Sequence, residues 1–173
     1  MTLPHPRSLV LTAVLAGCAP QSDPDVQAKL AAHDAVINEL PRGFYEPGLG
    51  DLMHALQLRH AKLWFAGTAG NWELAAFELH EIRENLDRIV RWHADNEDAP
   101  MGPSIKAYMQ TGRYALDRSI TQRNSADFTA AFDRFTQGCN ECHTAAKHGF
   151  IVIQRPTTEP YSNQRWAPEA SDS

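Results

Sequence analysis

Four stretches of the chain repeat apolar residues at alternating spacings of three and four, and this pattern constrains the fold more than any other feature. The stretches cover about residues 49–66, 72–95, 103–121 and 125–148. Such spacing places an apolar stripe on one face of an α-helix, and striped helices pack nearly parallel, at about 20° to one another. The predicted stripes are Met53, Leu56, His60, Leu63 and Gly67; Ala75, Leu79, Ile82, Leu86, Ile89 and His93; Ile105, Met109, Gly112, Leu116 and Ile120; and Phe128, Phe132, Phe135, Cys139, Cys142 and Ala146.

Residues that favour helix ends fall at the borders of these stretches. Asn71 and Asn124 stand where N-caps are expected, Pro103 suits a first helical turn, and Gly149 suits a C-terminal cap. The connections between the stretches are short, and short connections force neighbouring helices to run antiparallel. The sequence therefore predicts an all-α protein, with an up-down-up-down antiparallel four-helix bundle over residues 49–149.

A short N-terminal helix and a C-terminal extension flank the predicted bundle. Residues 18–25 are polar and read as a tether, and residues 26–48 are expected to form a weakly amphipathic helix and a Gly/Pro-rich loop. The extension, residues 150–173, begins with Phe-Ile-Val-Ile at 150–153. We expect this run to pack on the helices, because four exposed hydrophobic residues in a row would be a liability, and Trp166 to be a second anchor.

Residues 1–17 have the form of a bacterial signal peptide. Arg7 precedes an apolar run at 9–15 that is too short to span a bilayer, and the run leads to Leu-Ala-Gly followed by Cys18. This ending resembles the lipoprotein box, in which the cysteine is lipidated once the leader is removed. The alternative is a free cysteine in a leader that is simply cut off. Because Ala19 follows Cys18 where inner-membrane retention usually has Asp, we expect an outer-membrane lipid anchor facing the periplasm.

The charge of the chain restricts its partners only weakly. The formal net charge is −5 and no basic patch or stripe appears, which argues against nucleic acid as a partner. A mildly acidic surface fits many protein partners and selects none of them. A homodimer is left open.

The segment Cys139-Asn140-Glu141-Cys142-His143 has the pattern of covalent c-type haem attachment. Thiols at i and i+3 lie on one face of a helix, where each can add to one vinyl group of the porphyrin. His143 projects from the same side and is the expected proximal iron ligand. The signal peptide would deliver the chain to the compartment in which such haem is attached. We therefore expect one haem c.

Three other kinds of site compete with haem for this motif. A zinc site needs four ligands, and no second cysteine pair accompanies Cys139 and Cys142. A thioredoxin-like dithiol belongs at the start of a helix in an α/β fold, whereas this motif ends a helix in an all-α chain. A disulfide between helical i and i+3 positions has unfavourable geometry. All three are weaker than the haem interpretation.

Because the motif lies near the end of the fourth predicted helix, the chain resembles cytochrome c-prime and its low-spin relatives of the cytochrome c-556 type. The resemblance covers about residues 49–149. Members usually carry an aromatic and then a basic residue three and four places after the histidine; here Ala146 and Lys147 stand there, so only the basic one matches. The resemblance implies a distal iron ligand from the first helix, a methionine in low-spin members, or an apolar residue in five-coordinate members.

Met53 and His60 are the two candidates for that distal position. His143 is about five residues from its helix end, or about 8 Å of rise, and in an antiparallel bundle it faces the start of the first helix. Met53 lies about 6 Å into that helix and matches this depth, whereas His60 lies about 16 Å in. We expect Met53 before His60, with an open site shielded by apolar residues as the third alternative. Arg59 and Lys62 are expected to be solvated or to approach the haem propionates.

These expectations favour periplasmic electron transfer as the function. A methionine and a histidine would hold the iron in both oxidation states, as an electron carrier needs. Binding or sensing of nitric oxide or carbon monoxide at a five-coordinate haem is the alternative. An enzyme is less expected, because His60 has no evident acid or base partner at helical spacing. The sequence does not identify the redox partner protein.

Overall fold

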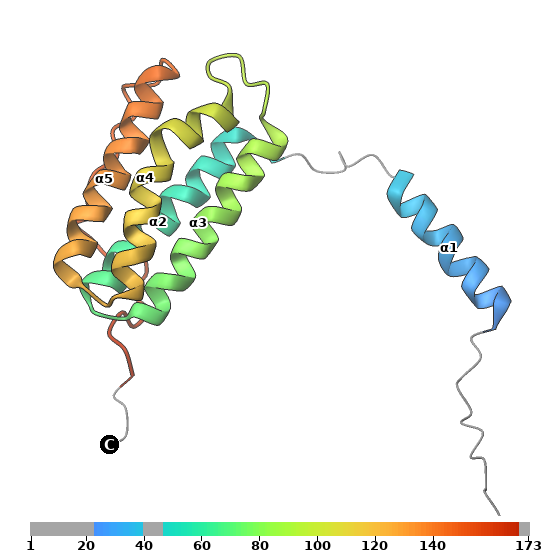
Figure 1. The fold of residues 1–173 in the computed structure, drawn as a ribbon, viewed down its shortest axis with the longest axis horizontal. Coiled ribbons are helices and arrows are strands. Elements are labelled where there is room, and N and C mark those ends of the chain that lie inside the picture. Colours follow the sequence, from blue (N-terminus) through green and yellow to red (C-terminus); the bar gives the residue numbers. More distant parts are fainter. Residues whose placement is uncertain (1–22, 40–46, 170–173) are drawn as a thin grey trace, which may run out of the picture. The chain divides into compact units, whose positions relative to one another are not determined.

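The structure is a computed structural model that describes residues 23–39 and 47–169, and the chain divides into two units, Met1–Tyr45 and Glu46–Ser173. The described residues form five helices and no strand, so this part of the chain is all-α (Figure 1). None of these helices is both long and apolar enough to cross a membrane. The helices are α1 (Pro24–Glu39), α2 (Leu49–Thr68), α3 (Trp72–Trp92), α4 (Met101–Thr121) and α5 (Ser125–Ala145).

Helix α1 belongs to the first unit. Its side chains from residue 24 to 36 are exposed, including the hydrophobic Val26, Leu30 and Val36. Lys29 and Asp25 form an ion pair across one turn, 2.7 Å between Nζ and Oδ2. The short helix predicted after residue 26 is thus confirmed and begins two residues earlier. The predicted signal peptide, Cys18 and most of the loop before residue 48 lie outside the described residues.

The four amphipathic helices predicted from the sequence are confirmed, and their predicted bounds differ from the observed ones by at most three residues. Both predicted N-caps are present. The Asn71 side chain accepts a hydrogen bond from the backbone N–H of Leu74 at 3.1 Å, and the Asn124 side chain accepts two bonds from the first turn of α5. Each cap satisfies backbone donors that a helix start leaves without partners. The asparagines therefore fix where α3 and α5 begin.

The predicted cap at Gly149 is wrong, because α5 ends earlier. Helix α5 stops at Ala145, and Lys147 takes the left-handed conformation with φ of 61°. The N–H of His148 donates to the carbonyl of His143 at 2.7 Å, and the N–H of Lys147 donates to Thr144 at 3.1 Å. These two hydrogen bonds define a Schellman motif at the end of α5. Lys147 occupies the left-handed position in which glycine is usual.

Helices α2 to α5 pack together around an aromatic core. Helix α3 contacts α2 and α4, and α5 contacts α4 and α2. Figure 1 shows these four helices side by side. The residues buried between them follow the predicted stripes, and the largest fully buried side chains include Phe128, Phe132, Phe135, Leu63, Ile82, Ile89 and Leu116.

Two glycines allow α4 and α5 to approach closely. A Cβ atom built on Gly138 would lie 2.2 Å from the carbonyl oxygen of Tyr108, and one on Gly112 would lie 2.7 Å from the Cα of Phe135. Both distances are far below van der Waals contact, so only glycine fits at these crossings. Since Gly138 directly precedes Cys139, this approach holds the cysteine motif against α4.

Residues 149–166, here called the strap, follow α5 without regular secondary structure. Arg155 forms an ion pair with Asp133 of α5, and its guanidinium lies 5.0 Å from the centre of the Trp64 ring on α2. Trp166 is buried, with its ring 5.5 Å from that of Phe65. The predicted anchoring role of Trp166 is thus confirmed.

The predicted packing of residues 150–153 is wrong for the first part of the run. Phe150 is 79% exposed and Val152 is 69% exposed, while Ile153 is half-buried. Hydrogen bonds between the backbone of Ile153 and α5 hold the strap in this position, and they leave the side chains of Phe150 and Val152 pointing to solvent.

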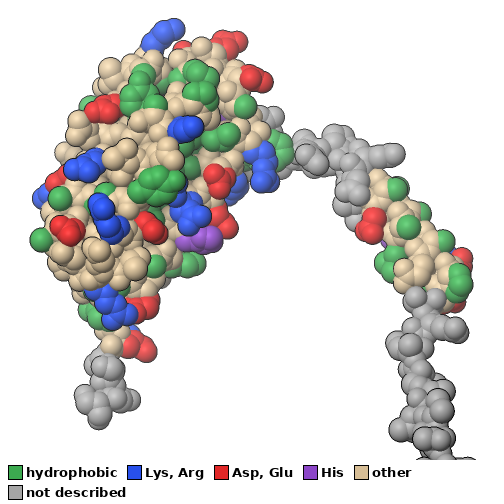
Figure 2. Space-filling model, in the orientation of Figure 1, with side chains coloured by type: hydrophobic (Ala, Val, Ile, Leu, Met, Phe, Trp, Pro, Cys, Tyr) green, Lys and Arg blue, Asp and Glu red, His purple; other side chains and the backbone are tan. Residues whose placement is uncertain are grey.

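On the face seen in Figure 2, charged side chains of both signs are interspersed. No field of one sign therefore covers that face.

Candidate functional site

An apolar cavity of about 450 Å³ lies within the second unit, a volume in the usual range of small-molecule and cofactor sites. It brings together all five site residues that were predicted in the helices: Met53, His60, Cys139, Cys142 and His143. The rest of the lining is Leu49, Gly50, His54, Leu56, Gln57, Leu86, Asn96, Met101, Ile105, Met109, Phe135, Ala146, His148, Ile151 and Ile153. The two isoleucines come from the strap, so this segment forms part of the wall.

Cys139 and Cys142 are free thiols one helical turn apart on α5. Burial raises the pKa of Cys139 to about 12, with the neighbouring Cys142 adding to the rise, and burial also raises the pKa of Cys142. Both thiols therefore stay protonated at neutral pH. Redox-active dithiols need at least one thiol with a lowered pKa, which argues against a thioredoxin-like role.

The donor atoms around the cavity do not form a cluster that would bind a bare metal ion. Within residues 23–39 and 47–169, no three or more His, Cys, Asp or Glu side chains gather closely enough to hold one. A structural zinc site needs four such donors, and a catalytic zinc site needs three. An iron held in a porphyrin takes only one or two ligands from the protein, so a haem site does not require such a cluster.

His143 is held in one ring form by the strap. Its Nδ1 lies 2.9 Å from the carbonyl oxygen of Ile151. A carbonyl can only accept a hydrogen bond, so Nδ1 carries a hydrogen, and Nε2 is the ring nitrogen whose lone pair can bind a metal. Metal-binding histidines use this arrangement, with one ring nitrogen donating to a carbonyl and the other binding the metal. Nothing in the sequence pattern indicated Ile151, because the contact uses its backbone.

His60 is buried in the core, and its Nε2 already has a partner. Nε2 lies 2.8 Å from the hydroxyl oxygen of Thr136, and that hydroxyl donates to the carbonyl of Phe132 at 2.9 Å. Because the hydroxyl has one hydrogen, it accepts from His60, so Nε2 carries the hydrogen. Burial lowers the pKa of His60 to about 4, and the ring is neutral at pH 7. To bind iron through Nε2, His60 would have to lose this hydrogen bond to Thr136.

Met53 is half-buried and packs against the hydrophobic core while lining the cavity. A thioether is a weak hydrogen-bond acceptor, so it gives up little on binding a soft metal. The predicted order of the two distal candidates is therefore supported by what each donor atom already does. It stays a prediction.

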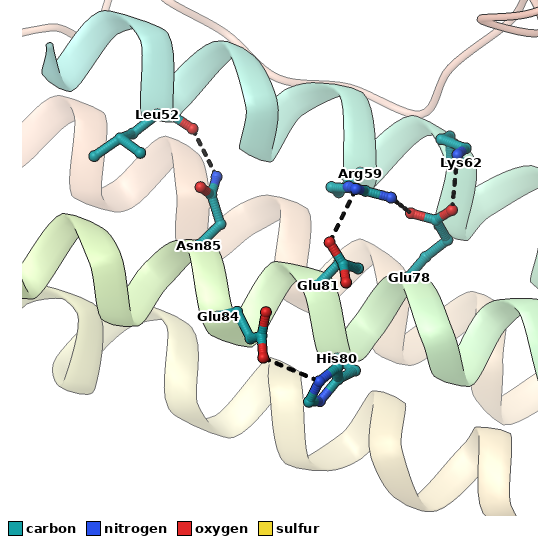
Figure 3. Close-up of polar contacts among 8 residues, drawn as sticks. All are labelled: Leu52, Arg59, Lys62, Glu78, His80, Glu81, Glu84 and Asn85. Atoms are coloured by element: carbon teal, nitrogen blue, oxygen red, sulfur yellow. Dashed lines mark hydrogen bonds and ion pairs between the residues drawn. The ribbon is translucent and has the colours of Figure 1, made fainter. Parts of the chain in front are cut away.

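Arg59 and Lys62 do not line the cavity, and the expectation that their charges are solvated is wrong; their approach to haem propionates stays a prediction. Both bind Glu78 of α3, which is completely buried, at 3.1 Å from Arg59 and 3.0 Å from Lys62 (Figure 3). Arg59 also pairs with Glu81 at 2.9 Å. The sequence feature that could have indicated this cluster is Glu78 itself, because a carboxylate directly beside Leu79 of the predicted stripe is close to the core.

Comparisons with models of protein families, with curated proteins and with solved structures found no match to this chain.

Proposed function

We propose that residues 49–149 bind one haem c, attached through Cys139 and Cys142, with His143 as the proximal iron ligand, and carry electrons. The observation that carries this proposal is the geometry of His143. Its Nδ1–H is bonded to the Ile151 carbonyl, which leaves the lone pair of Nε2 for a metal, and His143 lines the same apolar cavity as both cysteines.

The helical arrangement that this proposal assumes is the up-down-up-down antiparallel four-helix bundle of the cytochrome c-prime and cytochrome c-556 type. Three observations support it. Only a few residues separate α2 from α3 and α4 from α5, consecutive helices contact one another, and α2 also contacts α5. Short turns between long helices favour antiparallel neighbours.

A bound haem would supply an iron centre that changes its charge by one electron. The chain's own residues would do the rest. The thiols would fix the porphyrin, His143 and Met53 would hold the iron as neutral ligands, and the apolar wall would exclude water. Ligands that stay in place in both oxidation states keep the reorganisation on electron transfer small, which suits a carrier.

The proposal includes export to the periplasm and a lipid anchor on Cys18, placed in the outer membrane. It rests on the leader-like residues 1–17 and on Ala19. Acyl chains contribute about 0.8 kcal/mol per buried methylene group, so several chains would hold the haem domain at a membrane surface. The electron-transfer partner would then be a protein that reaches that surface.

Extraction of haem with acidified organic solvent tests the covalent attachment. The wild-type protein is expected to keep its haem, and the double variant Cys139→Ala, Cys142→Ala is expected to lose it. Cys18→Ser is the matched control, because it removes the third cysteine and should retain covalent haem. If the wild-type protein holds no haem, or releases it freely, the proposed function is wrong.

A further inference from the structure

Asn140, which lies between the two cysteines, binds the strap through both groups of its side-chain amide. Its Nδ2 donates to the carbonyl of Ile153 at 2.9 Å, and its Oδ1 accepts from the N–H of Ile153 at 2.7 Å. This pair satisfies the donor and the acceptor of one backbone residue at once. It fixes both the position and the direction of the strap at Ile153.

The carbonyl that binds His143 belongs to a residue two places before this tether. Ile151 accepts from His143 Nδ1 at 2.9 Å, and the Ile151 N–H donates to the carbonyl of His148 at 2.8 Å. The segment between 148 and 153 is thus held by a turn at one end and by Asn140 at the other. These two attachments leave the Ile151 carbonyl little freedom.

We propose that Asn140 is a positioning residue for His143. It holds the strap so that the Ile151 carbonyl keeps the hydrogen of His143 on Nδ1. The lone pair of Nε2 is then available to bind a metal. This proposal rests on the proposed function, in which Nε2 binds haem iron. A histidine that donates to a carbonyl is a stronger electron donor at its other nitrogen, and it stabilises ferric over ferrous iron.

The strap has a second attachment to the helices, at Arg155. Comparing the two attachments distinguishes a specific effect of Asn140 on His143 from a general loss of strap packing. Arg155 binds Asp133 and stacks over Trp64, two residues beyond Ile153. Its loss should free the strap beyond residue 155 and leave the Asn140–Ile153 pair in place. The two tethers are therefore expected to differ in their effect on His143 if the effect passes through the Ile151 carbonyl.

The test compares Asn140→Leu with the wild-type protein in two measurements. Leucine matches asparagine in size and favours helix more strongly, so α5 is not weakened. In the haem-free full chain, ¹⁵N NMR of the His143 ring should change from the Nδ1–H form to a mixture of both forms. In the haem-loaded protein, the preference for ferric iron should fall about tenfold, which raises the reduction potential by about 59 mV for one electron.

Arg155→Ala and Asn163→Ala are the controls, the latter in an exposed part of the strap. Both should leave the ring form and the potential unchanged. The proposal is overturned if Asn140→Leu leaves His143 in the Nδ1–H form, or if Arg155→Ala produces the same shift. If the wild-type protein holds no haem, the proposed function fails, and the NMR result on the haem-free chain still decides the role of Asn140.

Discussion

Met53 and His60 both line the cavity, and the state of their donor atoms separates them. The imidazole of His60 is tied to Thr136 in the core, whereas the thioether of Met53 gives up no strong hydrogen bond to reach a metal. Depth along the helices favours Met53 for an independent reason, because His143 lies two residues from the end of α5 and Met53 four residues from the start of α2, whereas His60 lies eleven residues in. Both reasons favour Met53 as the distal ligand of the proposed haem.

Replacing Met53 by Leu should remove the sulfur–iron ligand and leave the volume of the side chain nearly unchanged. We expect the weak long-wavelength band of the ferric absorption spectrum to disappear, the iron to become high-spin, and carbon monoxide to bind. His60→Leu is the matched control and should keep the band. The opposite pattern would make His60 the ligand. A wild-type protein that is already high-spin would favour gas binding over electron transfer.

At the level of single residues, side-chain spacing predicted five residues that line one cavity, and it gave no indication of the backbone groups that contact them. Cys139, Cys142 and His143 were found from a local motif, and Met53 and His60 from helical spacing. Ile151 was missed because its carbonyl is a group that every residue has. The role of Asn140 was also hidden, since its partner lies in a segment with no periodicity to place it.

The contact between α4 and α5 depends on the absence of two side chains. Gly112 and Gly138 lie on different helices, and each sits against the backbone of the other helix. A backbone carbonyl, unlike the end of a flexible side chain, cannot move aside alone. Any Cβ at Gly138 must therefore shift one helix against the other.

Gly138→Ala should lower the free energy of unfolding by about 1–3 kcal/mol, the usual cost of overpacking. Gly50→Ala is the control. Gly50 lies in the first turn of α2, its added Cβ meets no atom within 4 Å apart from its chain neighbours and the nearby backbone of its own helix, and alanine favours helix. It should leave stability unchanged or raise it by up to about 1 kcal/mol. Urea unfolding of both variants measures this difference, and equal effects would contradict the close crossing.

At the level of elements, the sequence predicted the helices well because stripes and caps are local signals. Asn71 and Asn124 marked two starts correctly. The end of α5 was misplaced because Gly149 is the commoner residue for a left-handed ending, while the hydrogen bonds of the ending close at Lys147. The strap was misjudged because hydrophobicity suggested buried side chains at Phe150 and Val152, and its attachment is made by polar groups.

The stability of the whole second unit should depend on pH through His60. Burial holds the pKa of His60 near 4 in the folded chain, against about 6.5 when unfolded. Between these values the unfolded chain binds the extra proton, so the free energy of unfolding falls as pH is lowered from 6.5. The loss is complete below about pH 4 and amounts to about 3 kcal/mol at most.

Urea unfolding at several pH values checks this expectation. The free energy of unfolding of His60→Leu should vary less between pH 6.5 and 4 than that of the wild-type protein. Thr136 keeps its bond to the Phe132 carbonyl in the variant, so no buried hydroxyl is left without a partner. Parallel curves for the two proteins would show that His60 does not control this dependence.

On the scale of the whole molecule, the sequence predicted an all-α chain because no strand pattern competes with the four stripes. The cavity was predicted only as a set of residues. Its wall also contains Ile151 and Ile153, which depend on how the strap returns to α5. That return is a long-range contact made by a few hydrogen bonds, and such contacts leave no repeating trace in a sequence.

The ion pairs that buried Glu78 and its neighbour Glu81 form with Arg59 and Lys62 should respond to heating differently from the apolar core. Water solvates charges less favourably as temperature rises, so the cost of burying this cluster declines, while the gain from burying apolar surface levels off. The α2–α3 contact, which the cluster joins, should therefore strengthen on warming relative to the α4–α5 contact, which depends on close packing at glycines. Heat would then loosen the α4–α5 side of the unit, which carries the two cysteines, before the α2–α3 side.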